Sequence, residues 1–309
     1  MRPLQLGPDR GVPTSFALAG GERLVALATP PAPAQAQKGL VLVVHGLGGS
    51  SGRPGVRRLA LGLQQAGFAV LRLNLRGAGP GRGLARGTYA AACNSDLLPV
   101  LHQAAALAAP APLLAVGLSL GGTVLLNAAL AEPALLAGLV CVSSPLDLAA
   151  SSAQIERPRN GLYHRWLLRA LRAQTLADPY GLEPLERDRL RGGGAVRSVR
   201  AFDAAITAPR WGFADAAAYY RQASPLPQLL AGQPLPPALL VHALDDPWVP
   251  ASATCRLVEA GQRGASAGAD LEVLLTAAGG HNGFHGRGDG PTASWADRLT
   301  ARWLARLVG

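Results

Sequence analysis

Short, almost uninterrupted apolar runs recur along this chain, at residues 40–44, 69–75, 113–116, 138–143, 238–244 and 271–275. Runs of this length and character are typical of parallel strands that are buried on both faces. Spacers of helical length separate most of them, and we expect helices at 56–66, 88–108, 123–130, 251–261 and 293–307. This alternation predicts an α/β fold with a doubly wound, mostly parallel sheet. A hairpin at 15–28, with Gly20 and Gly21 in its turn, is expected to precede the sheet.

The strand rhythm stops between residues 144 and 237. Helices are expected there at 162–173, 183–191 and 214–222, and the stretch holds eight of the fifteen aromatic residues. The sequence therefore predicts a core formed by 1–143 and 238–309, and a helical cap or lid insertion at 144–237. The aromatic side chains either form the insertion's own small core or line an apolar substrate pocket beneath it. Both interpretations stay open at this point.

Composition narrows the class of partner. The chain has 309 residues, of which 49% are hydrophobic, so it can bury a large core. Its formal net charge is +10, a value that raises the question of nucleic-acid binding. However, the basic residues are scattered, Lys38 is the only lysine, and the chain is rich in alanine, glycine, arginine and proline, as a GC-rich coding sequence would produce. We therefore expect no nucleic-acid partner.

The cysteines and the apolar stretches of the chain indicate in which cellular compartment the protein is expected. Cys93, Cys141 and Cys255 are too few and too widely spaced for a disulfide framework or a metal site, so they are expected to be reduced. Residues 1–9 lack the apolar centre of a signal peptide. Residues 97–131 carry no Asp, Glu, Lys or Arg, but prolines and glycines interrupt them, which favours a buried strand and helix. We expect a cytoplasmic protein without an integral membrane segment.

The sequence GLSLGG at residues 117–122 joins a predicted strand to a predicted helix. A Gly-x-Ser-x-Gly turn in this context is the pattern of a nucleophile elbow, which holds a serine at the top of a parallel sheet. The glycines let the strand and helix approach closely at so sharp a turn. Ser119 is therefore the candidate nucleophile.

A serine nucleophile needs a base, and the base needs an acid. His281 follows the predicted strand at 271–275, and Asp245 and Asp246 follow the one at 238–244, so the order is serine, acid, histidine. We prefer Asp246 as the acid because Pro247 follows it directly, and we expect Asp245 to cap the helix that begins near residue 251. His285 is the reserve base.

The loop at residues 45–50, HGLGGS, follows another central strand. Backbone N–H groups in such a glycine-rich loop can point at a developing negative charge. The predicted oxyanion hole is formed by the backbone N–H groups of Leu47 and Leu120. His45 is expected to shape the loop through a hydrogen bond, and the Gly-x-Gly-x-x-Gly spacing of a dinucleotide site is absent.

Several of these stretches together resemble the YheT-like branch of the α/β hydrolases, bacterial relatives of the eukaryotic ABHD esterases and phospholipases. The resemblance spans nearly the whole chain from about residue 39. It implies an α/β-hydrolase fold with a helical cap and a serine carboxylic-ester hydrolase that uses no metal or organic cofactor. It rests on HGLGGS (45–50), NLRGAG (74–79), GLSLGG (117–122), FD (202–203), ITAP (206–209), GFAD (212–215), YYRQASP (219–225), ALDDP (243–247) and GHNGF (280–284).

Residues and resemblance together predict a serine esterase that cleaves small-molecule, short- to medium-chain acyl esters through an acyl-enzyme. A thioesterase, an acyltransferase or a phospholipase-like lipid hydrolase on the same three residues is the alternative, since different acceptors can resolve the acyl-enzyme. A hydrolase-fold protein that binds a ligand without turnover is the alternative of another class. The sequence does not reveal the oligomeric state.

Overall fold

A computed structural model of the chain describes residues 6–33, 35–191, 196–262, 270–287, 289–290 and 292–309. Residues 1–5, which belong to the stretch examined for a signal peptide, lie outside this set. Among the described residues, no helix is both long and apolar enough to cross a membrane.

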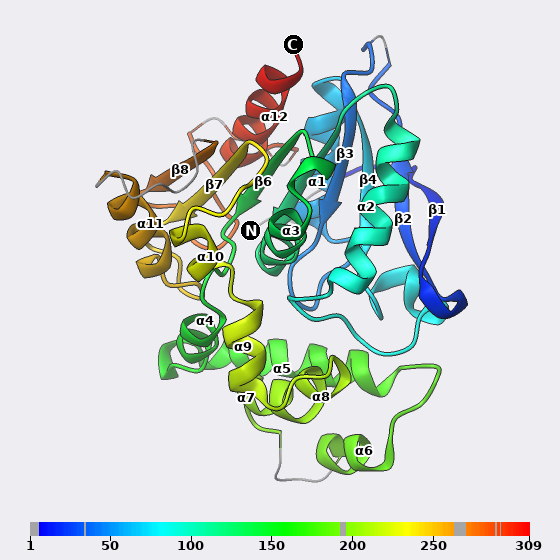
Figure 1. The fold of residues 1–309 in the computed structure, drawn as a ribbon, viewed down its shortest axis with the longest axis vertical. Coiled ribbons are helices and arrows are strands. Elements are labelled where there is room, and N and C mark those ends of the chain that lie inside the picture. The colour runs from blue at the N-terminus through cyan, green and yellow to red at the C-terminus, as the bar shows by residue number, and fades with distance from the viewer. Residues whose placement is uncertain (1–5, 34, 192–195, 263–269, 288, 291) are drawn as a thin grey trace.

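Eight strands of the described chain form one sheet in the order β1-β2-β4-β3-β5-β6-β7-β8 (Figure 1). The hairpin pairs β1 with β2 and joins β4 in antiparallel fashion, and every pairing from β4 to β8 is parallel. The predicted doubly wound, mostly parallel sheet is therefore confirmed. The strands are β1 (Val12–Ala17), β2 (Arg23–Thr29), β3 (Gly39–Val44), β4 (Phe68–Asn74), β5 (Leu113–Leu118), β6 (Gly138–Val142), β7 (Ala238–Ala243) and β8 (Leu271–Thr276).

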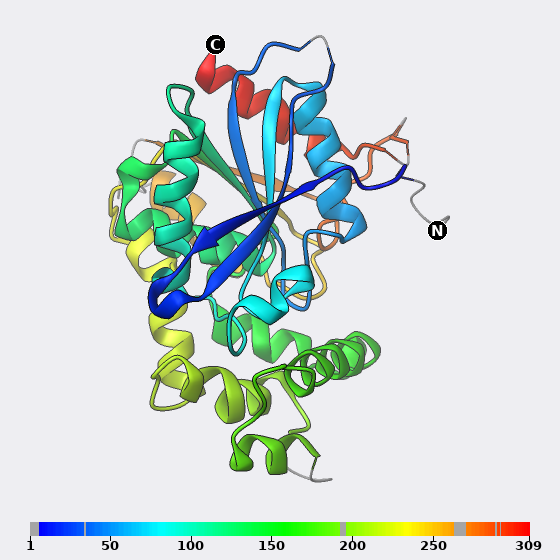
Figure 2. The ribbon, with the colours of Figure 1, turned by 90° about the vertical axis from the view of Figure 1, so that its right-hand side faces the viewer.

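Helices cover both faces of the sheet, which explains why its central strands are continuously apolar. In β3, Leu40 and Leu42 belong to the core on one face and Val41 and Val43 to the core on the other. Figure 2 shows the sheet between helices α1 and α2. The first face packs on α2 (Asn94–Ala108), α3 (Leu120–Ala131) and α11 (Ser252–Gln262), and the second on α1 (Pro54–Gln65) and α12 (Trp295–Val308).

Helix α2 begins at Asn94, six residues later than expected from the sequence. The backbone of the preceding stretch is engaged elsewhere, since the Ala91 N–H donates to the Tyr219 hydroxyl at 2.9 Å. The Tyr89 hydroxyl in turn accepts from the Gly48 N–H at 2.8 Å. These long-range bonds hold residues 88–93 as a connection to the loop after β3.

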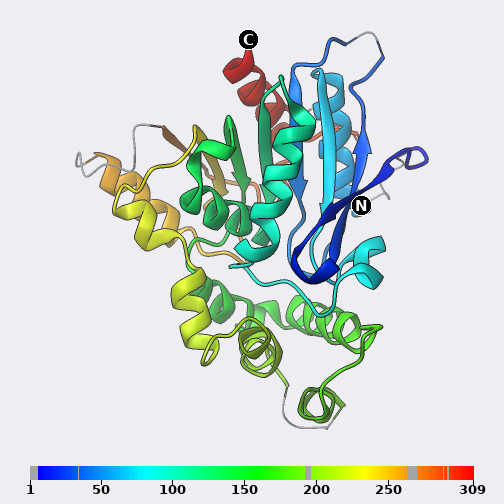
Figure 3. The same ribbon diagram turned by 45° about the vertical axis from the view of Figure 1, so that its right-hand side comes forward.

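Between β6 and β7 the described residues form helices and no strand. Helices α5 to α9, together called the helical layer here, lie at the carboxyl end of the parallel strands (Figures 1 and 3). Side chains of this layer form a third apolar cluster, which includes Leu167, Leu171, Phe202 and Ile206 and packs against Leu47. The segment contains α4 (Leu148–Ile155), α5 (Gly161–Leu176), α6 (Pro184–Arg191), α7 (Val199–Phe202), a π-helix (Asp203–Thr207), α8 (Ala208–Arg210), α9 (Ala216–Ala223) and α10 (Leu226–Leu230).

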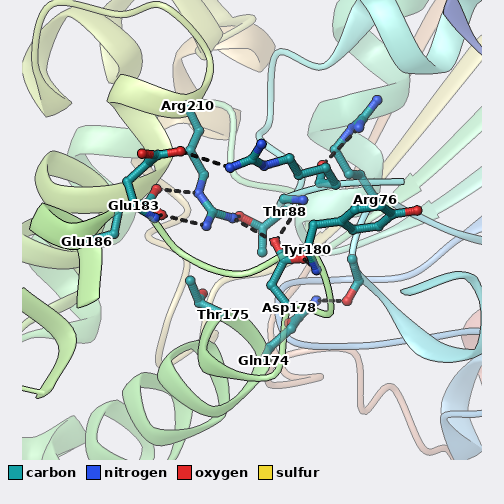
Figure 4. A network of polar contacts seen from close by, with 12 residues as sticks. Arg76, Thr88, Gln174, Thr175, Asp178, Tyr180, Glu183, Glu186 and Arg210 are labelled. Atoms are coloured by element: carbon teal, nitrogen blue, oxygen red, sulfur yellow. Dashed lines mark hydrogen bonds and ion pairs between the residues drawn. The ribbon is translucent and has the colours of Figure 1, made fainter. Parts of the chain in front are cut away.

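A charged network ties the helical layer to the loop after β4 (Figure 4). Arg210 donates to both carboxylate oxygens of Glu186, at 2.6 and 3.0 Å. Asp178 lies 3.8 Å from Arg210 and accepts the Gly87 N–H at 2.9 Å. Further hydrogen bonds join Gln174 to the Gly77 carbonyl, Tyr180 to the Gly83 carbonyl and Arg86 to Glu183. The layer is therefore anchored by directional polar contacts as well as by its apolar cluster.

Candidate active site

Ser119 lies in the sharp turn between β5 and α3, with φ 53° and ψ −126°. Positive φ is costly for a residue that bears a Cβ, so the surroundings must enforce it. The flanking glycines allow this: a Cβ on Gly117 would collide with the Cα of Gly122, and a Cβ on Gly121 would collide with the Val44 carbonyl oxygen. The elbow expected from the sequence is therefore formed, with Ser119 half-buried at the end of β5.

Three of the predicted site residues come together at the carboxyl ends of β5, β7 and β8. The Ser119 hydroxyl lies 2.9 Å from Nε2 of His281. Nδ1 of His281 lies 2.8 Å from Oδ2 of Asp246. Since a carboxylate only accepts, Nδ1 carries the proton and Nε2 is left to accept from the serine. This is the tautomer that a general base requires.

Asp246 is held as a buried carboxylate, with its side chain fully excluded from solvent. Burial opposes ionisation, but the hydrogen bonds from His281 and from the backbone N–H groups of Val249 and Trp248 outweigh it and lower the pKa of Asp246. Both backbone bonds go to Oδ1, at 2.9 and 3.0 Å, which leaves Oδ2 for the histidine. The carboxylate is therefore fixed before any substrate binds.

Asp245 does not cap the helix that begins near residue 251, and that expectation was wrong. Its Oδ1 accepts the N–H groups of Gly279 and Gly280 at 2.9 and 2.8 Å. The reason is the sheet: the Leu244 N–H donates to the Thr276 carbonyl, so the β7–β8 pairing continues and brings Asp245 beside the turn that carries His281. Asp246 thus holds the ring of His281, and Asp245 holds the backbone of the turn that precedes it.

His285 is exposed and contributes nothing to this arrangement. His45 is fully buried, donates from Nδ1 to the Gly46 carbonyl at 2.8 Å and accepts the Leu75 N–H at Nε2 at 3.3 Å. Burial lowers the pKa of His45 to about 4, so it is neutral at neutral pH. Its two bonds fix the loop after β3, as the sequence suggested.

That loop passes directly over the nucleophile. A Cβ on Gly46 would lie 3.0 Å from the Cβ of Ser119, so only glycine fits comfortably here. Leu47 and Leu120 both line the pocket that contains Ser119. The Leu120 N–H is the first of helix α3 and has no partner in the helical ladder. Both residues therefore lie at the pocket that contains Ser119, and their role as an oxyanion hole stays a prediction.

The pocket at Ser119, called the nucleophile pocket here, is narrow, with a cavity volume of about 70 Å³. Its apolar lining comes from the loops at the ends of the strands, from α4 and from the helical layer, and includes Leu47, Leu148, Ile155, Leu167 and Val199. The pocket is concave and mostly apolar with a few convergent polar groups, which is the usual form of a small-molecule site.

Two aromatic residues of this pocket were missed by the sequence analysis as site residues. Trp248 lies beside the histidine, with ring centroids 4.8 Å apart, and Tyr163 of α5 stacks on Trp248 at 3.5 Å. The only sequence signal for Trp248 is that it comes two residues after Asp246. Tyr163 was one of several aromatic residues in the insertion, and nothing local distinguished it.

Comparisons with known proteins identify the family of the chain. Residues 35–267 match the family described as serine aminopeptidase, S33. The putative esterase YheT of Escherichia coli K12 is 33% identical over 290 residues, which cover 92% of this chain and 82% of YheT.

More distant relatives carry names of lipid-related enzymes. Phospholipase ABHD3 of Mus musculus is 29% identical over 249 residues, 79% of this chain, and the match spans only 58% of ABHD3. The medium-chain fatty acid ethyl ester synthase/esterase 2 of Saccharomyces cerevisiae is 27% identical over 301 residues, covering 87% of this chain and 62% of the yeast protein.

Among solved structures, a soluble variant of monoglyceride lipase from Saccharomyces cerevisiae superposes with a TM-score of 0.63. It is 17% identical, and the match covers 99% of this chain and 98% of the lipase, so it bears on the fold alone. The eight-stranded, mostly parallel sheet covered by helices fits the α/β-hydrolase fold. With its match to the S33 model and its identity to YheT, the chain belongs to the YheT-like and ABHD-like branch of the α/β hydrolases.

Proposed function

We propose that the protein is a serine hydrolase that cleaves carboxylic esters of short to medium acyl chain length. The observation that carries this proposal is the chain of contacts from Ser119 Oγ to His281 Nε2, at 2.9 Å, and from His281 Nδ1 to Asp246, at 2.8 Å. Such spacing lets the imidazole take the serine proton as the hydroxyl attacks.

In this mechanism Ser119 attacks the acyl carbon and His281 accepts its proton. The buried Asp246 carboxylate stabilises the imidazolium that forms. The backbone N–H groups of Leu47 and Leu120 bind the oxyanion of the tetrahedral intermediate. His281 then protonates the departing alkoxide, and water resolves the acyl-enzyme through the same steps in reverse order. No step requires a metal or an organic cofactor.

We also propose that the segment 144–237 acts as a cap over this site. Leu148 and Leu167 of that segment line the nucleophile pocket, so substrate and product must pass its helices. An apolar wall of this kind excludes bulk water and favours acyl chains over polar ligands. Cytoplasmic location stays a prediction from the sequence.

The test is hydrolysis of p-nitrophenyl esters from acetate to dodecanoate by wild type and by Ser119→Ala, with a fluorophosphonate label in parallel. We expect turnover with an optimum at short to medium chains, labelling of wild type, and loss of both in the variant. Adding ethanol and measuring ethyl ester separates transfer from hydrolysis. If wild type neither turns over nor labels, the protein binds a ligand without chemistry and the proposal is wrong.

A further inference from the structure

Asp203 is a carboxylic acid in the wall of the nucleophile pocket that the proposed mechanism does not use. It is the first residue of the π-helix Asp203–Thr207, an irregular turn that is frequent at functional sites. It also lines a smaller adjoining cavity, called the side cavity here, which shares Leu47, Leu120 and Tyr219 with the nucleophile pocket. Asp203 therefore stands where the two spaces meet.

The hydrogen bonds of Asp203 leave it with unused capacity. Oδ2 accepts the Tyr220 hydroxyl and Oδ1 accepts the Thr207 hydroxyl, both at 2.7 Å. A carboxylate has about four acceptor positions, so about two remain. Among the described residues no cationic side chain forms an ion pair with it, and Arg200 of α7 instead lies over the Tyr220 ring at 5.8 Å.

Ionisation of Asp203 is energetically unfavourable in this position. Burial raises the pKa of Asp203 to about 6, and the nearby Glu156 at the end of α4 adds to the effect, against the hydrogen bonds from Tyr220 and Thr207. At neutral pH the side chain is still ionised beside an apolar pocket, with no counterion in the part of the chain that the structure describes. A ligand group that donates a hydrogen bond to it would remove part of this cost, whereas an alkyl chain would add to it.

The position of His281 indicates which half of an ester meets Asp203. Because His281 protonates the leaving oxygen, the alcohol half must lie on its side of Ser119, near Trp248. The side cavity lacks Ser119, His281 and Trp248 but contains Leu47 and Leu120, whose N–H groups would hold the acyl oxygen. The acyl chain therefore extends toward the side cavity. The remaining polar lining there comes from Thr88, Tyr89, Gln174, Thr175 and Thr207.

We propose that Asp203 is a specificity-determining residue that accepts a hydrogen bond from a hydroxyl group on the acyl chain, so that the enzyme prefers hydroxyacyl esters to plain alkyl esters. This inference rests on the proposed serine-hydrolase function and names its substrate class. It explains why a carboxylate lines a pocket that is otherwise mostly apolar.

The test compares two substrates of nearly equal shape, p-nitrophenyl 3-hydroxybutyrate and p-nitrophenyl 3-methylbutyrate, by their kcat/KM at pH 8. Hydrogen bonds to charged groups predict a wild-type preference for the hydroxyl of about ten- to a hundredfold. In Asp203→Leu, which presents only an apolar surface, the preference should disappear, with a lower KM for the methyl substrate. Asp203→Asn, which keeps one acceptor oxygen, should lie between the two.

Glu156→Gln is the matched control, because it removes a neighbouring negative charge that does not line the pocket, and its preference should equal that of wild type. Damage to the fold would lower kcat/KM for both esters together and leave the ratio of the two values unchanged. A wild type that turns over both esters equally, or a preference that survives in Asp203→Leu, overturns the assignment. Absence of any wild-type turnover or fluorophosphonate labelling would instead count against the serine-hydrolase proposal itself.

Discussion

The adjacent carboxylates Asp245 and Asp246 offer an internal control for the proposed mechanism. Both are changed to asparagine, one at a time, which preserves the shape of the side chain. Asp246→Asn can still accept the backbone N–H groups of Trp248 and Val249, but its neutral amide cannot stabilise the imidazolium of His281 or hold the ring in the required tautomer. We expect kcat to fall about 10⁴-fold, which corresponds to about 5 kcal/mol of transition-state free energy.

Asp245→Asn should behave differently. A single oxygen, Oδ1, accepts both Gly279 and Gly280, and an amide oxygen can replace it in that role. Only an exposed charge is lost, so kcat should fall by less than about tenfold. The assay is steady-state hydrolysis of p-nitrophenyl butyrate, with thermal unfolding measured on both variants to confirm that each is folded. If Asp245→Asn loses as much activity as Asp246→Asn, the assignment of the acid is wrong.

Three other outcomes are expected. Gly117→Ala brings a Cβ into steric overlap with the Cα of Gly122, so it should lower the free energy of unfolding by about 3 kcal/mol. A denaturation midpoint equal to that of wild type would contradict this. Arg210→Met leaves Glu186 and Asp178 without their shared cation and should cost about 3 kcal/mol in urea denaturation, whereas no loss would mean that the network contributes nothing. Asp203 has a folded pKa of about 6 against 3.8 for the ordinary group, so wild type should lose at most about 3 kcal/mol between pH 4 and pH 7 as Asp203 ionises. The free energy of unfolding of Asp203→Asn should therefore rise relative to that of wild type between pH 4 and pH 7. A difference between the two proteins that does not change with pH would contradict the raised pKa of Asp203.

Local patterns in the sequence were enough to predict the sheet and the sharp turn that carries Ser119. Buried parallel strands leave an uninterrupted apolar run, and the elbow requires glycine at positions that a Cβ would block, as Gly117 and Gly121 illustrate. The order of Ser119, an acid and His281 along the chain follows from the loops at the ends of successive strands. Such signals are contained in a few consecutive residues.

Features that depend on contacts between distant segments could not be predicted from a few consecutive residues. The role of Asp245 follows from the extension of the β7–β8 pairing to Leu244, which no neighbouring residue reveals. The stacking of Tyr163 on Trp248 joins residues 85 positions apart. The start of α2 depends on the hydrogen bond that the Ala91 N–H donates to the distant Tyr219 hydroxyl. The boundaries of the cap at 144 and 237 stay a prediction.

Strands β6 and β7 are hydrogen-bonded neighbours, with Leu139 opposite Ala238, although residues 143–237 separate them in the chain. Because the two strands are parallel, the connecting segment leaves the sheet at the carboxyl end of β6 and returns to it at the amino end of β7, so it takes the place of the crossover connection that parallel neighbours require. Insertions, deletions or replacement of helices within it need not alter any strand pairing or move Ser119, Asp246 and His281. Exchange of this segment between relatives is thus a practical way to change substrate preference while these three residues stay the same. The suitable junctions for such chimaeras are the end of β6 and the start of β7.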